Sequence, residues 1–134
     1  MRGAVVLEGV GKSFGGAFGV RDVWLEIRPG EFLTLLGPSG CGKTTTLRLI
    51  AGFIEPDGGE IRIGPKRIAA RGSSLPPERR NMAMIFQSYA LWPHMTVAQN
   101  LDFTLELRRI RGAEAKRRID ETLGLVDKIG RAHV

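Results

Sequence analysis

The 134-residue chain has 43% hydrophobic and 25% charged side chains, which supports one folded domain with a core and excludes an intrinsically disordered chain. Its longest apolar runs, such as Phe32 to Leu36, are far shorter than the roughly 18 residues that cross a bilayer. The net charge of +6 leaves nucleic acid, anionic lipid and phosphorylated ligands open as partners. Cys41 is the single cysteine and no signal-peptide pattern opens the chain, so we expect a reducing, cytoplasmic compartment.

The N-terminal part predicts two short antiparallel strands. Val5 to Leu7 is apolar, and Val23, Leu25 and Ile27 alternate with polar residues, as in a strand with one buried face. Phe32 to Leu36 then reads as a strand buried on both faces of a parallel sheet, because its apolar run is nearly continuous.

A glycine-rich loop follows that strand and a helix follows the loop. Leu47, Ile50 and Ala51 recur at helical spacing from Lys43 onward, and Gly52 can end the helix in a left-handed conformation. The order is therefore strand, glycine loop, helix.

The second half predicts two further strands and two helices. Glu60 to Ile63 alternates after a Pro-Asp-Gly-Gly turn, and Met82 to Phe86 is a second apolar strand candidate. Thr96 with Gln99 fits a capping box for a helix to about Arg109. A last helix is expected from Glu114 to Leu123. The basic residues between Arg108 and Arg118 are mixed with acidic ones, which favours a solvated helix face over a nucleic-acid surface.

The glycine loop matches the Walker A pattern at every constrained position. Its residues are Gly37, Pro38, Ser39, Gly40, Cys41, Gly42, Lys43 and Thr44, and we call this segment the phosphate loop. Its glycines let consecutive backbone N–H groups turn toward a phosphate chain, and the following helix adds the positive end of its dipole. Lys43 is then placed for the β and γ phosphates of ATP, and the Thr44 hydroxyl for Mg²⁺.

Two segments together resemble the nucleotide-binding domains of ABC transporters. One is the phosphate loop extended to Thr45; the other runs from Arg80 to Leu101 and is similar to the Q-loop region of importers for iron(III), polyamines, sulfate and sugars. The resemblance implies an α/β fold with a P-loop NTPase core, an N-terminal antiparallel β subdomain and the start of a helical subdomain. It implies boundaries at residues 1–95 and 96–134 within one partial ABC ATPase domain.

The same resemblance implies roles for individual residues. Gln87 would contact Mg²⁺ and the attacking water, and Phe14 would stack on adenine. Pro38, Ser39, Cys41 and Thr45 would line the nucleotide site with the rest of the phosphate loop. The segment from Tyr89 to Val97, with Trp92, Pro93, His94 and Met95, would dock on the permease.

The resemblance also implies an assembly and a location. A second nucleotide-binding subunit and transmembrane permease subunits would be direct partners, and a periplasmic or extracellular solute-binding protein an indirect one, with no nucleic acid partner. The subunit would lie in the cytoplasm, peripheral to the inner face of the cell membrane.

Three family features do not occur in these residues: an apolar strand ending in Asp-Glu (Walker B), the Leu-Ser-Gly-Gly-Gln signature and the switch histidine. We therefore expect a truncated ATP-binding importer subunit, not competent for hydrolysis alone, with weak stability because Phe32 to Leu36 would lack its parallel neighbours. Two alternatives stay open. One is a non-catalytic nucleotide-binding fragment; the other is a soluble P-loop kinase, whose Arg-rich lid could use Arg79 and Arg80.

Overall fold

The computed structural model describes residues 3–87 and 91–130, which divide into two compact units, Met1–Ile85 and Phe86–Val134. The first unit contains the strands β1 (Val5–Phe14), β2 (Ala17–Ile27), β3 (Gly58–Ile63), β4 (Lys66–Ala70) and β5 (Ser73–Ser74), the helix α1 (Lys43–Ala51) and the short 3-10 helix η1 (Pro77–Arg79). The second unit contains the helices α2 (Val97–Leu107) and α3 (Gly112–Gly130).

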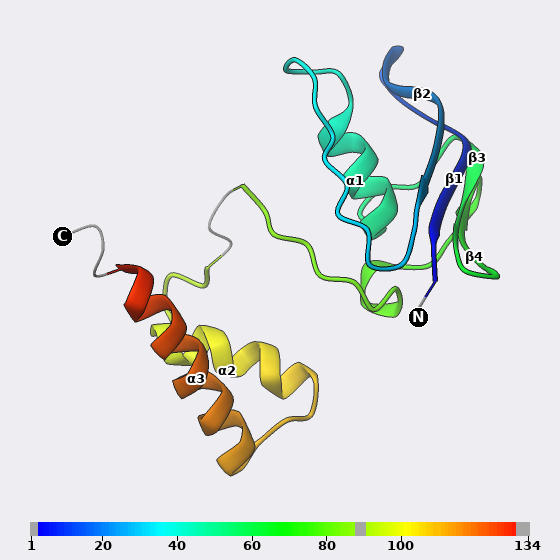
Figure 1. Ribbon diagram of the computed structural model, residues 1–134. Coiled ribbons are helices and arrows are strands. Elements are labelled where there is room, and N and C mark those ends of the chain that lie inside the picture. The colour runs from blue at the N-terminus through cyan, green and yellow to red at the C-terminus, as the bar shows by residue number, and fades with distance from the viewer. Residues whose placement is uncertain (1–2, 88–90, 131–134) are drawn as a thin grey trace. The chain divides into compact units, whose positions relative to one another are not determined.

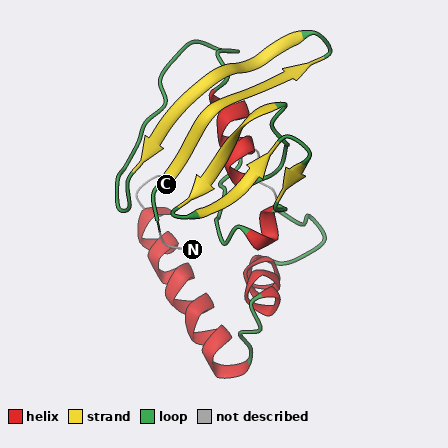
Figure 2. Cartoon of the chain, turned by 90° about the vertical axis from the view of Figure 1, so that its right-hand side faces the viewer, coloured by secondary structure: helices red, strands yellow, loops and turns green. Residues whose placement is uncertain are grey.

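The first unit is an antiparallel sheet with α1 on one face (Figures 1 and 2). The strand order is β2-β1-β3-β4-β5, so β1 and β3 pair across the segment that contains β2 and α1. The two predicted N-terminal strands are thus confirmed as an antiparallel pair, each longer than its apolar pattern. The core between sheet and helix is formed by buried aliphatic residues: Leu7, Val10, Val20, Leu49, Ile61, Ile63, Ile68 and Ala69.

Local bulges explain why the alternation in β1 is incomplete. Leu7 and Val10 are both buried although they are three residues apart, and the pairing register with β2 shifts between them. Gly9 lies in this shift with a φ of +60°, a conformation that glycine adopts without strain. The bulge therefore returns the strand's apolar side chains to the core face.

The prediction that Phe32 to Leu36 and Met82 to Phe86 form strands is wrong for this structure. In the described part of the chain neither segment pairs with a strand, and Phe32, Leu36 and Ile85 are 94%, 90% and 97% exposed. A parallel strand exists only while neighbours accept and donate its backbone hydrogen bonds. Without such neighbours the same apolar residues remain in loops, and the expected weak stability stays a prediction.

The second unit is a pair of helices whose boundaries follow local chemistry. Thr96 caps α2: its Oγ1 accepts from the Gln99 backbone N–H, while the Gln99 side chain accepts from the Thr96 N–H, so the predicted capping box is confirmed. On α3, Arg117 pairs with Glu114 and Glu121, and Arg118 pairs with Glu114. These exposed pairs at helical spacing support the prediction of a solvated, mixed-charge face.

Replacing Thr96 with Ala should weaken the start of α2 by about 1 kcal/mol, because the N-terminal amides of the helix lose their side-chain acceptor. Hydrogen exchange of the amides at residues 97–100 would report this as faster exchange. Thr104→Ala is the matched control, since Thr104 is exposed within the same helix. Equal effects of the two substitutions would contradict a capping role for Thr96.

Candidate functional site

The phosphate loop leads directly into α1, as the motif requires. Gly42 is the N-cap residue with a φ of +94°, and no side chain caps the first turn. A Cβ at Gly42 would lie 2.5 Å from the Gly19 carbonyl oxygen and 2.6 Å from Val20 Cγ1 on β2. Only glycine therefore fits, both for its backbone angle and for its close approach to β2. The uncapped N–H groups of α1 are left for another acceptor.

Lys43 lies over the phosphate loop. Its Nζ donates to the carbonyl oxygens of Gly37 and Pro38, each at 2.7 Å, and lies 3.5 Å from Cys41 Sγ. Two backbone carbonyls are modest partners for an ammonium group, which a phosphate chain with full negative charge would attract more strongly. These bonds thus hold the Lys43 ammonium group inside the loop, where it can bind an anion.

The loop forms one wall of a cavity of about 150 Å³. Its lining residues are Phe14, Gly19, Gly40, Gly42, Lys43, Thr44 and Thr45. The structure therefore brings Phe14, 49% exposed at the end of β1, together with half of the phosphate loop, namely Gly40, Gly42, Lys43 and Thr44. Gly19 makes this possible, because a Cβ there would meet Phe14 Cε2 at 2.6 Å. An aromatic face beside a phosphate site is the arrangement that a nucleoside phosphate needs.

Thr44 is the residue of this cavity that the Walker A pattern places for Mg²⁺. Its hydroxyl is exposed in the first turn of α1, next to Lys43. Mg²⁺ in nucleotide sites commonly takes one or two protein oxygens and completes its shell with phosphate and water. One hydroxyl at the mouth of the loop fits that pattern. Thr46, two residues further, is buried and its Oγ1 donates to the Gly42 carbonyl oxygen, so it is structural.

Gln87 and the segment after it belong to the second unit. Gln87 is exposed in a bend, and its placement toward Mg²⁺ and water stays a prediction. Tyr89 lies outside the described residues. Trp92 is 49% exposed; its ring packs edge-on against His94 and Phe103, each with a centroid distance of 5.9 Å. Asn100 holds the segment in place, since its Nδ2 donates to the carbonyl oxygens of Trp92, Met95 and Thr96.

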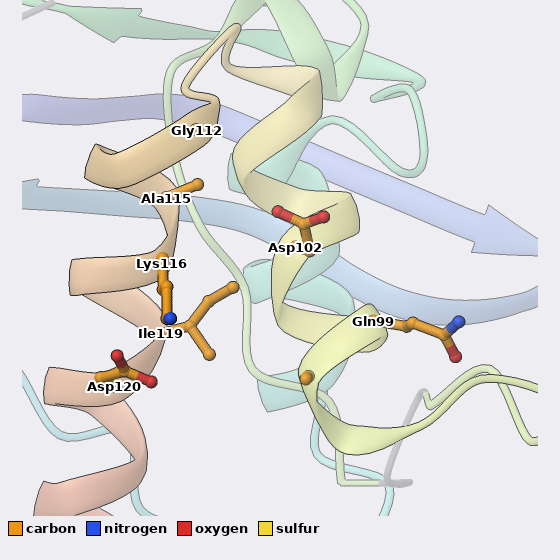
Figure 3. A pocket seen from close by; sticks show the side chains of 8 residues that line it. Gln99, Asp102, Gly112, Ala115, Lys116, Ile119 and Asp120 are labelled. Atoms are coloured by element: carbon orange, nitrogen blue, oxygen red, sulfur yellow. The ribbon is translucent and has the colours of Figure 1, made fainter.

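A second cavity, of about 440 Å³, lies between α2 and α3 (Figure 3). Its walls combine Ala98, Ala115 and Ile119 with Asp102, Lys116 and Asp120. Figure 3 shows Ala115 and Ile119 on the side of α3 that faces α2. Two carboxylates against one ammonium make a poor phosphate site, although the cavity is larger than the one at the phosphate loop. The smaller cavity, with Lys43 and the phosphate loop in its wall, is therefore better suited to a phosphate group.

Arg80 and Asp57 make contacts that their local sequence patterns do not predict. Arg80, grouped with Arg79 as a candidate for a mobile lid, is fully buried and donates to the Leu49 and Ile50 carbonyl oxygens at the end of α1. A buried side chain with these bonds is not part of a mobile lid, which counts against the kinase alternative. Asp57, read only as a turn residue, binds the end of β1 just before Phe14. Neither contact is local in sequence.

Among the described residues, no helix has the length and apolar character that a membrane crossing requires.

Comparison with known proteins identifies the family of the chain. The family model described as "ABC transporter" matches residues 20–133. The chain is 51% identical over 132 residues to the trehalose/maltose import ATP-binding protein MalK of Thermococcus litoralis, covering 95% of this chain and 36% of that protein. It is 48% identical over 133 residues to the spermidine/putrescine import ATP-binding protein PotA of Thermobifida fusca, covering 96% and 34%. The chain thus spans about a third of the length of these curated relatives.

A solved structure of an ATP-binding cassette has a similar fold. An ATP-binding cassette in a dimeric, post-hydrolysis state bound to ADP and Pi matches with a TM-score of 0.72 and 29% identity, covering 92% of this chain and 57% of the other. The predicted partial ABC ATPase fold is therefore confirmed. With its phosphate loop, its neighbouring aromatic ring and these matches, the chain belongs to the ABC transporter family.

Proposed function

We propose that this chain binds ATP with Mg²⁺ at the phosphate loop and acts as the nucleotide-binding part of an ATP-binding subunit of an ABC importer. The observation that carries the proposal is the cavity in which Phe14, Lys43 and Thr44 meet. Phe14 would stack on adenine, Lys43 would bind the β and γ phosphates, and Thr44 would ligate Mg²⁺. Pro38, Ser39, Cys41 and Thr45 complete the proposed nucleotide site.

In the intact subunit the proposed reaction is ATP hydrolysis: water forms a bond to the γ phosphorus, the bond from that phosphorus to the β–γ bridging oxygen breaks, and ADP and inorganic phosphate leave. Binding and charge compensation are the tasks that the first unit can perform: the phosphate loop supplies backbone donors and Lys43 supplies a positive charge. The resemblance gives Gln87 the proposed role of orienting the water and binding Mg²⁺. Bound Mg²⁺ would supply further neutralisation of the phosphate charge.

Nucleotide binding is tested by comparing ATP, ADP, AMP and adenosine in calorimetric titrations with Mg²⁺. We expect ATP and ADP to bind far more tightly than AMP, because most of the proposed contacts are made to the β and γ phosphates, and adenosine to bind weakest. Equal affinities for ATP and adenosine would contradict a phosphate site.

The importer role is supported by the relatives, whose names describe sugar, polyamine and iron(III) import. It implies a second nucleotide-binding subunit, permease subunits and, indirectly, a solute-binding protein, on the cytoplasmic side of the membrane. The segment around Trp92 is the proposed permease contact, because Leu91 and Trp92 remain 65% and 49% exposed while Asn100 binds the Trp92 backbone.

A photo-crosslinking residue at Trp92 tests this contact in cells. The expected products contain a membrane protein with several spanning segments. The same residue at Arg71, which is exposed in the first unit, is the control. Identical products at both positions, or only soluble products at Trp92, would contradict permease docking through this segment.

A further inference from the structure

Asp57 connects the turn before β3 to the end of β1. Its Oδ1 accepts from Lys12 Nζ at 2.8 Å, and its Oδ2 accepts from the backbone N–H and the hydroxyl of Ser13 at 2.8 and 3.0 Å. Its own backbone N–H donates to the Gly11 carbonyl oxygen at 2.8 Å. One residue thereby binds three consecutive positions of β1, all of them directly before Phe14.

The backbone of Gly59, two residues after Asp57, also lies against β1. Gly59 has a φ of +74°, and a Cβ at this position would overlap the carbonyl oxygens of Glu8 and Gly9. The turn therefore contacts β1 through the Asp57 carboxylate, and the start of β3 contacts it through the Gly59 backbone. Sliding of the turn along the strand would break both contacts.

Phe14 directly follows the residues of β1 that Asp57 contacts. It is the last residue of β1, and the hairpin turn after it consists of two glycines, Gly15 and Gly16, both with positive φ. Lys12 Nζ, held by Asp57, lies 5.8 Å from the centroid of the Phe14 ring, within the range of a cation–π contact. Asp57 thus anchors the chain that enters Phe14 and the ammonium group above its ring.

We propose that Asp57 is a positioning residue that fixes the Phe14 ring relative to the phosphate loop, so that adenine and the phosphates of one nucleotide can be bound together. The inference rests on the proposed nucleotide site. A carboxylate suits this task because it accepts several hydrogen bonds at once and pairs with an ammonium group, whereas a neutral amide offers one acceptor oxygen. The Lys12 and Ser13 bonds hold the pKa of Asp57 at about 2, so the carboxylate is charged at neutral pH.

The test compares two ligands in calorimetric titrations of the chain with Mg²⁺: ATP, which has a base, and inorganic tripolyphosphate, which has none. Asp57→Ala should bind ATP about fivefold more weakly, and Phe14→Ala about tenfold more weakly, through loss of base stacking. Both variants should bind tripolyphosphate like the parent chain. In the double variant, Asp57→Ala should add no further loss, because its effect acts through Phe14.

Two further variants are controls that distinguish a loss of the Asp57 contacts from a general loss of structure. Glu60→Ala removes a carboxylate from β3 that pairs with Arg62 and Arg67 instead of with the Phe14 segment, and should leave both affinities unchanged. Asp57→Asn preserves the side-chain volume and should show a smaller loss for ATP alone.

The possible contrary results distinguish failure of the Asp57 positioning role from failure of the proposed nucleotide site. Unchanged ATP affinity in Asp57→Ala and Asp57→Asn, equal losses for ATP and tripolyphosphate, or additive losses in the double variant would each overturn the positioning role. If Lys43→Ala loses ATP binding while Asp57→Ala does not, the proposed nucleotide site stands and this inference fails. If Lys43→Ala binds ATP like the parent, the nucleotide site itself fails.

Discussion

Lys43→Ala should weaken ATP binding by about 10- to 100-fold, the largest effect expected for any single change in the phosphate loop. The ammonium group lies within the loop, where the described residues offer it two carbonyl oxygens and a thiol sulfur. Alanine at position 43 cannot form the charge-assisted bonds that the ammonium group would make to phosphate. Calorimetric titration with ATP measures the change directly.

The matched control for this substitution is Lys66→Ala. Lys66 is exposed at the start of β4 and has the same charge, so a general electrostatic attraction of ATP to this basic chain would weaken equally in both variants. We expect Lys66→Ala to retain the parent affinity. The phosphate-site assignment would be untenable if Lys43→Ala retained it too.

Arg80→Met should lower the free energy of unfolding by about 3 kcal/mol. The buried guanidinium donates to the carbonyl oxygens of Leu49, Ile50 and Leu75 at 2.7 to 2.8 Å, and to the Ser74 hydroxyl at 2.7 Å. Methionine fills a similar volume but leaves these buried acceptors without a donor. The positive charge also faces the C-terminal end of α1, where the helix dipole is negative, and this contribution disappears.

Urea denaturation followed by circular dichroism measures the loss. Arg79→Met is the matched control, because Arg79 is the adjacent residue and is exposed; it should unfold at nearly the parent midpoint. Arg80→Lys should recover only part of the stability, since one ammonium group cannot span acceptors on both α1 and the loop before η1. Similar midpoints for the Arg79 and Arg80 variants would show that the buried bonds contribute little.

Local patterns predicted the elements whose causes are local. The phosphate loop and α1 follow from glycines and helical spacing within one short stretch, and α2 follows from the capping box at Thr96. β4 was not predicted, because its buried residues Ile68 and Ala69 are adjacent and do not alternate with exposed ones. The pairing register of β3 with β4 shifts at this point. A period of two is visible only in a strand without such irregularity.

Features that depend on distant partners could not be predicted in this way. Phe32 to Leu36 has the composition of a buried strand, but whether it pairs depends on neighbours that its own residues do not determine. Arg80 stands in a charged stretch that resembles a solvated loop, and its burial follows from the end of α1 lying next to it. Asp57 likewise reads as an ordinary turn residue until β1 is seen beside it.

The strand order has a consequence for how the chain folds. β1–β2, β3–β4 and β4–β5 are neighbours in sequence and can form quickly, whereas β1–β3 pairing must close the segment from residue 15 to residue 57. The phosphate loop and α1 lie inside that segment. If this closure is the late step, the nucleotide site is complete only after the folding barrier has been crossed. Bound nucleotide would then slow the unfolding of the first unit and leave its refolding rate nearly unchanged.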